Sequence, residues 1–149
     1  MKTPTPLEFI EATSEYLIEE ERAVRQVVFV EEQNVEPSIE YDEFEDSSRH
    51  YILKAGGRTV GCARYRWVGP DVKIERLAVL KEERRKGYGI FIMERMLEIS
   101  RSLGPRDIYL HSQLSAKGFY ERFGFEASGP VFKEAEIDHV KMYLLRGDE

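Results

Sequence analysis

The sequence lacks several features that mark secreted, membrane-spanning or metal-binding proteins. Its 149 residues include a single cysteine, Cys62, so no disulfide forms within the chain. No apolar run approaches the roughly 20 residues of a membrane-spanning helix, and the first residues have no apolar signal-peptide core. The three histidines have no spacing with cysteine that is typical of a metal site. These absences predict a cytoplasmic protein with no membrane span and no bound metal.

The composition is that of a folded protein. Hydrophobic residues make up 42% of the chain and charged residues 34%, which argues against a disordered polymer. A length of 149 residues favours a single domain, 1–149, with a sizeable core. The net charge of −6 argues against nucleic acid as the main partner. Cys62 lies in the apolar segment 59–68, so we expect a buried core residue rather than a nucleophile.

The order of hydrophobic patterns predicts an α+β fold. Apolar runs bounded by turn residues are typical of strands, and apolar residues three or four apart are typical of helices. Ser14 is the expected N-cap of the first helix. The strand that ends at Val79 leads through a helix to the next strand, so these two strands should be parallel neighbours. The expected strands are 7–13, 50–55, 59–68, 72–79, 107–111, 125–132 and 139–145, and the expected helices are 15–30, 90–103 and 115–123.

A basic, glycine-containing loop joins strand 72–79 to the following helix. It reads Arg84-Arg85-Lys86-Gly87-Tyr88-Gly89. A helix N-terminus carries unpaired N–H groups and a partial positive charge of about half an electron, and glycine lets a ligand approach those groups. The loop lacks the Walker pattern, and Ile92 stands where a dinucleotide fingerprint needs its third glycine. We therefore expect a pyrophosphate site of another type; the alternative is a solvated basic turn.

Two motifs in order resemble the GNAT superfamily of acyl-CoA N-acyltransferases. The first is Arg84-x-x-Gly87-x-Gly89, preceded by Leu77-Ala78-Val79, and the second is Phe119-Tyr120-x-x-x-Gly124-Phe125. A further segment, Arg-x-x-Val-Phe-Val-x-Glu-Gln over residues 25–33, followed by an acidic loop and His50, is similar to a small bacterial single-domain subgroup. The resemblance covers nearly the whole chain. It implies a mixed, mostly antiparallel sheet of about six to seven strands, with helices on both faces and a parallel pair splayed around the cofactor.

The resemblance implies an N-acetyltransferase that uses acetyl-CoA as co-substrate. The acetyl group would pass to a primary amine of a small molecule by direct attack in a ternary complex, which needs no protein nucleophile. Tyr120 is the candidate acid for the CoA sulfur, or else a core aromatic. Glu75 is the candidate base, directly or through a water, or else a strand-face ion-pair residue. The residues expected to bind the cofactor are Leu77, Ala78, Val79, Arg84, Arg85, Lys86, Gly87, Tyr88, Gly89 and Tyr120.

The sequence defines the residues that bind the acceptor amine less closely than those that bind the cofactor. The resemblance places Phe29, Glu32, Gln113 and His139 at the acceptor, with His111 beside Gln113. His139 matches a histidine that recurs at this position in the subgroup, for which a catalytic role and a structural role are the alternatives. The acidic segment 31–48 is either a solvated loop or an electrostatic lure for a cationic amine.

Other functions stay open at this stage. An acyl-CoA-binding regulatory module and an enzyme that acetylates a protein lysine or N-terminus share the same motifs. An exposed C-terminal edge strand allows a homodimer. A phosphorylated acceptor is a further alternative, for which a pocket would be formed by Arg22, Arg25, Arg49, Arg64 and Arg66.

Overall fold

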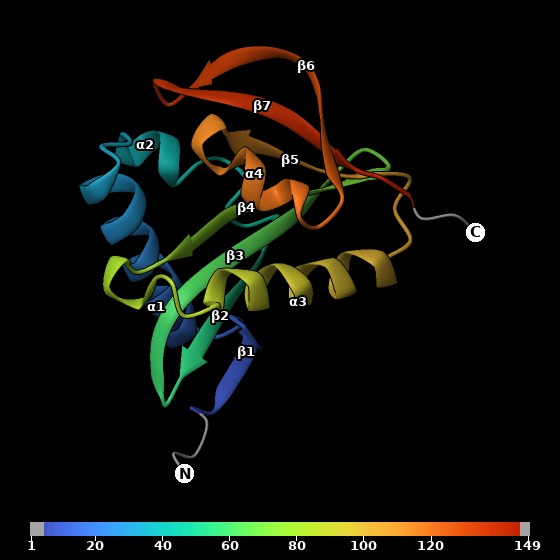
Figure 1. Ribbon diagram of the computed structural model, residues 1–149. Helices are drawn as coiled ribbons and strands as arrows, with labels where there is room; N and C mark the ends of the chain where they lie inside the picture. The colour runs from blue at the N-terminus through green and yellow to red at the C-terminus, as the bar shows by residue number, and fades with distance from the viewer. Residues whose placement is uncertain (1–4, 147–149) are drawn as a thin grey trace.

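The computed structural model describes residues 5–146, which form one seven-stranded sheet with helices packed on it (Figure 1). The strands are β1 Leu7–Glu11, β2 Arg49–Ala55, β3 Arg58–Val68, β4 Asp71–Val79, β5 Ile108–Gln113, β6 Phe125–Glu134 and β7 Ile137–Leu144. The α-helices are α1 Glu15–Arg25, α2 Pro37–Glu40, α3 Tyr88–Ser102 and α4 Lys117–Glu121. Three short helical turns complete the chain: π-helical η1 Gln26–Glu32 and the 3-10 turns η2 Lys81–Glu83 and η3 Leu114–Ala116.

The sheet confirms the predicted mixed, mostly antiparallel topology. Its strand order is β1-β2-β3-β4-β5-β7-β6, and only β4 and β5 are parallel neighbours. That pair is held at just two positions, Val72 opposite Ile108 and Lys73 opposite Tyr109. Beyond Lys73 the two strands separate, as Figure 1 shows for the diverging arrows of β4 and β5. From residue 75 onward, the edge of β4 that faces β5 therefore pairs with no other strand in the part of the chain that the structure describes.

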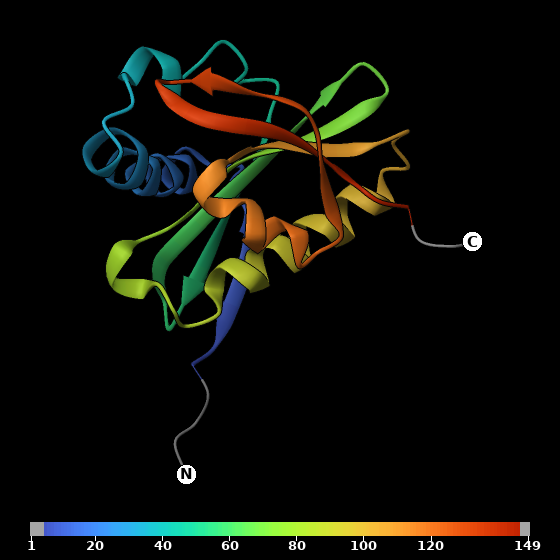
Figure 2. The same ribbon diagram turned by 45° about the horizontal axis from the view of Figure 1, so that its top comes forward.

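The two long helices, α1 and α3, cover opposite faces of the sheet (Figure 2). On one face, α3 buries Ile92 and Met96 in the main core. On the other, Val24 and Val28 pack against Cys62, whose side chain is fully buried, as expected. No helix within residues 5–146 is long and apolar enough to cross a bilayer.

The approach of α3 to β3 depends on a glycine, Gly61. A Cβ added at Gly61 would lie 2.7 Å from the carbonyl oxygen of Ala78 and 2.8 Å from Cδ1 of Ile92. The first of these neighbours is backbone, which cannot swing aside. Any side chain at this position would therefore push β4 or α3 away from β3.

The first helix is shorter than predicted. Ser14 caps it as expected, its hydroxyl accepting from the backbone N–H of Leu17 at 3.2 Å. The α-helix ends at Arg25, however, and continues as the π-helical turn η1 where the sequence predicted an α-helix to residue 30. π-helical turns are rare and occur frequently at functional sites.

Five of the eight acidic residues in the segment 31–48 are exposed, which fits the solvated-loop alternative: Glu31, Glu32, Glu36, Glu43 and Asp46. Glu40, Asp42 and Glu45 turn inward instead. Arg25 contacts Glu40 at 2.7 Å and Glu45 at 2.8 Å, while Arg64 contacts Asp42 at 2.8 Å. Because both arginine side chains are fully buried in these ion pairs, they are not free to form the pocket that the alternative of a phosphorylated acceptor would need.

Candidate active site

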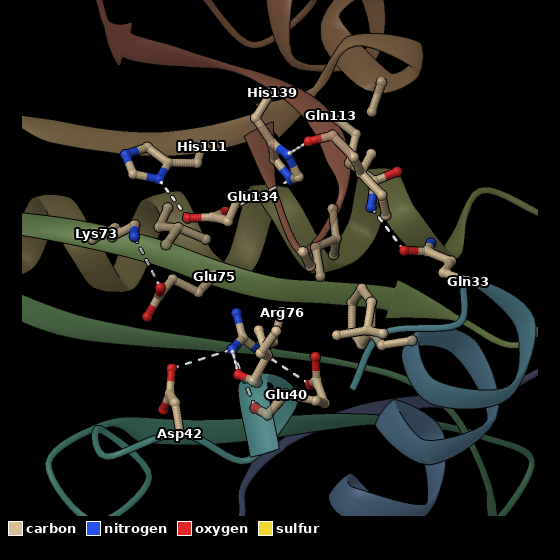
Figure 3. Close-up of a pocket in the computed structure, with 18 of the residues that line it drawn as sticks. Gln33, Glu40, Asp42, Lys73, Glu75, Arg76, His111, Gln113, Glu134 and His139 are labelled. Carbon is tan, nitrogen blue, oxygen red and sulfur yellow. Dashed lines mark hydrogen bonds and ion pairs between the residues drawn. The ribbon is translucent and has the colours of Figure 1, made fainter. Parts of the chain in front are cut away.

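A cavity of about 480 Å³ opens where β4 and β5 separate. Its walls come from segments that are distant in the sequence, namely η1, the loop after it, α2, the second half of β4, the end of β5, α4 and the β6–β7 hairpin (Figure 3). Apolar side chains such as Phe29, Ile39 and Ile74 share this lining with charged ones. The cavity thus joins Leu77 and Tyr120 to the acceptor-side candidates, while the Gly87–Gly89 loop is not part of its lining.

The Gly87–Gly89 loop forms the start of α3. Gly87 is the N-cap residue, with φ of +85°, a conformation that favours glycine, and no side chain caps the helix. The first backbone N–H groups of the helix are therefore free for an anionic ligand. A Cβ added at Gly89 would lie 3.5 Å from the ring of Phe119, which places the loop next to α4.

The three basic residues of this loop differ in their contacts. Arg84 forms a two-point ion pair with Glu32, and its Nε donates to the carbonyl oxygen of Val79 at 2.9 Å. The Nζ atom of Lys86 lies 3.4 Å from Oε1 of Glu83. Arg85 has an exposed side chain and φ of +65°. Glu32, the last residue of η1, thus contacts the loop and is not part of the cavity lining where the sequence placed it.

Tyr120 lies on α4, with its phenol lining the cavity. Its ring packs edge-to-face on Phe119 and Phe125, with centroids 5.1 Å and 6.2 Å away. Burial raises the pKa of the Tyr120 phenol. The hydroxyl is therefore protonated at neutral pH and able to donate a hydrogen bond.

Glu75 also lines the cavity, but its surroundings do not favour the predicted role of general base. Its carboxylate contacts Arg66 at 2.9 Å and both Lys73 and Arg64 at 3.1 Å. Burial opposes ionisation, but the cations, Lys73 foremost, outweigh it and lower the pKa of Glu75. A carboxylate held by three cations is a weak proton acceptor, so the alternative of a strand-face ion pair fits this residue better.

A bulge in β4 follows Glu75. Register between β3 and β4 shifts there, and Arg76 has φ of +59°, which is uncommon for any residue other than glycine. The guanidinium of Arg76 contacts Glu40 at 3.0 Å and Asp42 at 3.2 Å across the cavity (Figure 3). The bulge therefore ties the α2 region to β4 along one wall of the cavity.

On the acceptor side, Phe29, Gln113 and His139 line the cavity together. The side-chain amide of Gln113 donates to the Oε1 atom of Gln33 at 2.8 Å, which links the end of β5 to the segment after η1 (Figure 3). The sequence analysis did not single out Gln33, although it closes the Val-Phe-Val-x-Glu-Gln segment. His139 stands opposite Gln113 in the pairing of β5 with β7.

Glu134 is a site residue that sequence reasoning missed. It lies between two histidines, with Oε1 3.2 Å from Nδ1 of His111 and Oε2 3.7 Å from Nε2 of His139 (Figure 3). The hydrogen bond from His111 lowers the pKa of Glu134 to about 2, so it is a carboxylate at all ordinary pH values. No sequence motif marks this residue, because the contact depends on how the β6–β7 hairpin bends over the cavity. Among residues 5–146, no group of histidine and acidic side chains has the geometry of a metal site.

A family model for the acetyltransferase (GNAT) domain matches residues 15–146. This chain belongs to the GNAT family of acetyltransferases. The GNAT chain is 37% identical over 120 residues to an uncharacterized N-acetyltransferase of Bacillus subtilis, YjcF, covering 80% of this chain and 86% of that protein. The match confirms the resemblance carried by the Gly87–Gly89 loop and the Tyr120 segment.

Solved structures agree with the family assignment. An acyl-CoA N-acyltransferase from Pseudomonas aeruginosa superimposes with a TM-score of 0.83 at 25% identity, covering 94% of this chain and 100% of that one. A Bacillus subtilis acetyltransferase in complex with CoA has a TM-score of 0.70 at 20% identity, covering 94% of this chain and 97% of that one, which shows the shared fold. The GNAT fold and an acyltransferase activity follow from these matches.

Proposed function

We propose that this GNAT protein transfers an acetyl group from acetyl-CoA to the primary amine of a small molecule, by direct attack in a ternary complex. The observation that carries the proposal is the separation of β4 from β5, which opens a cavity between Tyr120 and the acceptor-side residues. The CoA bound by one structural neighbour supports acyl-CoA as the donor.

The free edge of β4 is where we place the pantetheine arm. Ala78 and Val79 pair with β3 on one side, and their other side faces the gap toward β5. Unpaired backbone groups are strong hydrogen-bonding groups, so they suit the amides of pantetheine. The pyrophosphate would then reach the N–H groups of Gly87, Tyr88 and Gly89 at the start of α3.

The chemistry follows from this placement. The amine nitrogen attacks the thioester carbon, negative charge develops on the carbonyl oxygen, and the C–S bond breaks. A backbone N–H of β4 would stabilise the oxygen, and Tyr120 would protonate the departing sulfur. Holding both substrates in one cavity supplies the orientation that a bimolecular reaction lacks.

The size of the cavity favours a small acceptor, and a comparison of acceptors tests this. Release of the CoA thiol from acetyl-CoA is followed with tyramine, putrescine and glucosamine, and with a lysine-containing basic peptide. Cys62 is buried and does not react with the thiol reagent. We expect release with at least one small amine and none with the peptide; release with the peptide alone would make this a protein acetyltransferase.

A further inference from the structure

The tautomer of neutral His139 is fixed by its own hairpin. Its Nδ1 atom lies 2.7 Å from the carbonyl oxygen of Ile137. A carbonyl oxygen only accepts hydrogen bonds, so Nδ1 carries the proton. In the neutral ring the lone pair is then on Nε2, the atom on the side of Glu134.

Glu134 is placed to stabilise the ring once it takes up a proton. Its Oε2 atom is 3.7 Å from Nε2. In the neutral ring Nε2 has no proton to donate, so no hydrogen bond forms, but the distance is within range of an ion pair with the imidazolium. Its other oxygen accepts a hydrogen bond from Nδ1 of His111 at 3.2 Å, which fixes the orientation of the carboxylate. The arrangement joins β5, β6 and β7 in one polar chain.

The turn that carries Glu134 is strained. Ala135 and Glu136 connect β6 to β7 with φ of +51° and +62°, a turn that normally uses glycine or asparagine. Such strain persists where the surrounding structure holds it, and it clusters at functional sites. Here the strained turn places Glu134, Ala135 and Ile137 on the cavity wall, while His139 stacks on Phe132 with ring centroids 6.0 Å apart.

The other charged groups around this corner are already paired. Lys73 and Glu75 of β4 contact each other at 3.1 Å. Arg76 across the cavity is bound by Glu40 and Asp42, and Arg66 is bound by Glu75. On the hairpin, Asp138 pairs with Lys133 outside the cavity. Glu134 differs from the other carboxylates that line the cavity. Within residues 5–146 it forms no ion pair with a lysine or arginine, and its partners are the two histidines.

We infer that His139 is the catalytic base of the acyl transfer, with Glu134 and His111 as positioning residues; this rests on the proposed function. As the amine nitrogen bonds to the thioester carbon, its proton passes to Nε2 of His139, and the C–S electron pair leaves with sulfur, which takes the proton of Tyr120. Solvent then removes the proton from His139 and returns one to Tyr120. Glu134 stabilises the imidazolium during the step.

Kinetics of His139→Gln and Glu134→Gln test the inference, with Asp138→Asn as a matched control on the same hairpin. We expect His139→Gln to lower kcat at pH 7 on the order of 10²-fold and to abolish the fall of kcat/KM on the acid side of the optimum. Glu134→Gln should lower kcat on the order of 10-fold, and Asp138→Asn should match wild type. An acid limb that persists in a folded His139→Gln protein would overturn the assignment.

A second measurement does not depend on the acceptor. Only three histidines are present, so imidazole nitrogen NMR can assign each one with single-histidine variants. We expect neutral His139 to carry its proton on Nδ1, and the opposite tautomer would overturn the inference by itself. If acetyl-CoA binds but no amine is acetylated, the proposed acceptor fails, whereas a failure confined to the His139 tests leaves the proposed function intact.

Discussion

The carboxylate of Glu32 holds the guanidinium of Arg84 through two contacts, each 2.7 Å long. One residue belongs to η1, which borders the acceptor side, and the other belongs to the loop that we assign to pyrophosphate. The ion pair therefore connects the two halves of the site. It also places a negative charge beside the proposed position of an anionic ligand, and Arg84 lowers the pKa of Glu32, so that charge is present at neutral pH.

Replacing Glu32 with glutamine should tighten acetyl-CoA binding. Arg84 keeps its bond to the Val79 carbonyl in this variant, so the loop retains its anchor while the competing carboxylate is lost. An exposed ion pair of this kind contributes about 0.2–1 kcal/mol, so we expect Kd to fall by a factor of about 1.4 to 5. Calorimetric titration measures the change. Weaker binding would mean that Glu32 instead positions Arg84 for the ligand.

Tyr120→Phe should separate binding from turnover. The ring contacts with Phe119 and Phe125 are kept, so the affinity for acetyl-CoA should stay within about two-fold of wild type. Loss of the proton donor should lower kcat on the order of 10²-fold. Steady-state kinetics with a good amine acceptor, beside calorimetry, gives both quantities. An unchanged kcat would remove Tyr120 from the chemistry.

Glu75→Gln should affect stability more than the pH profile. The substitution leaves Arg64, Arg66 and Lys73 without a shared carboxylate, and breaking a buried ion pair costs about 3–5 kcal/mol. Urea unfolding measures this cost. The acid side of the kcat/KM profile should be preserved, because the base lies elsewhere. If the acid limb disappeared in Glu75→Gln and persisted in His139→Gln, Glu75 would be the base after all.

His50 should make stability dependent on pH. Burial alone would lower its pKa, but a 3.0 Å contact with Glu21 and a 2.8 Å contact with the Glu45 carbonyl outweigh burial and raise it. A raised pKa stabilises the fold below the unfolded-state pKa of about 6.5, and this contribution is lost as pH rises through the folded value. The difference in unfolding free energy between wild type and His50→Gln should therefore shrink from pH 6 to pH 9. A difference that stays constant with pH would show that His50 is not charged in the folded protein.

Much of the fold was predictable from local signals. Hydrophobic period, turn residues and the crossover rule gave the seven strands, the parallel β4–β5 pair and the Ser14 cap. The Gly87–Gly89 loop and Tyr120 were found because each belongs to a motif that lies within a few residues. These are short-range features, which a single sequence displays directly.

The remaining features depend on contacts between distant residues. Glu40 and Glu45 looked like surface charges in an acidic run, because the partner that contacts both, Arg25, precedes them by 15 and 20 residues. Glu134 carried no motif, and its role depends on a strained turn and on His111 from another strand. Local periodicity does not encode pairings between distant residues, so these ion pairs and the place of Glu134 in the site could not be predicted from the sequence.

Titration of acetyl-CoA into wild type and Gly89→Glu protein tests the central claim most directly. An added Cβ at Gly89 makes only ordinary contacts, so the variant should fold, and its carboxylate would face the proposed pyrophosphate. Ser102→Glu adds the same charge at the far end of α3 as a control. We predict binding by wild type and the control, and none by Gly89→Glu. No binding by folded wild type at millimolar acetyl-CoA, or equal binding by all three proteins, would contradict the account.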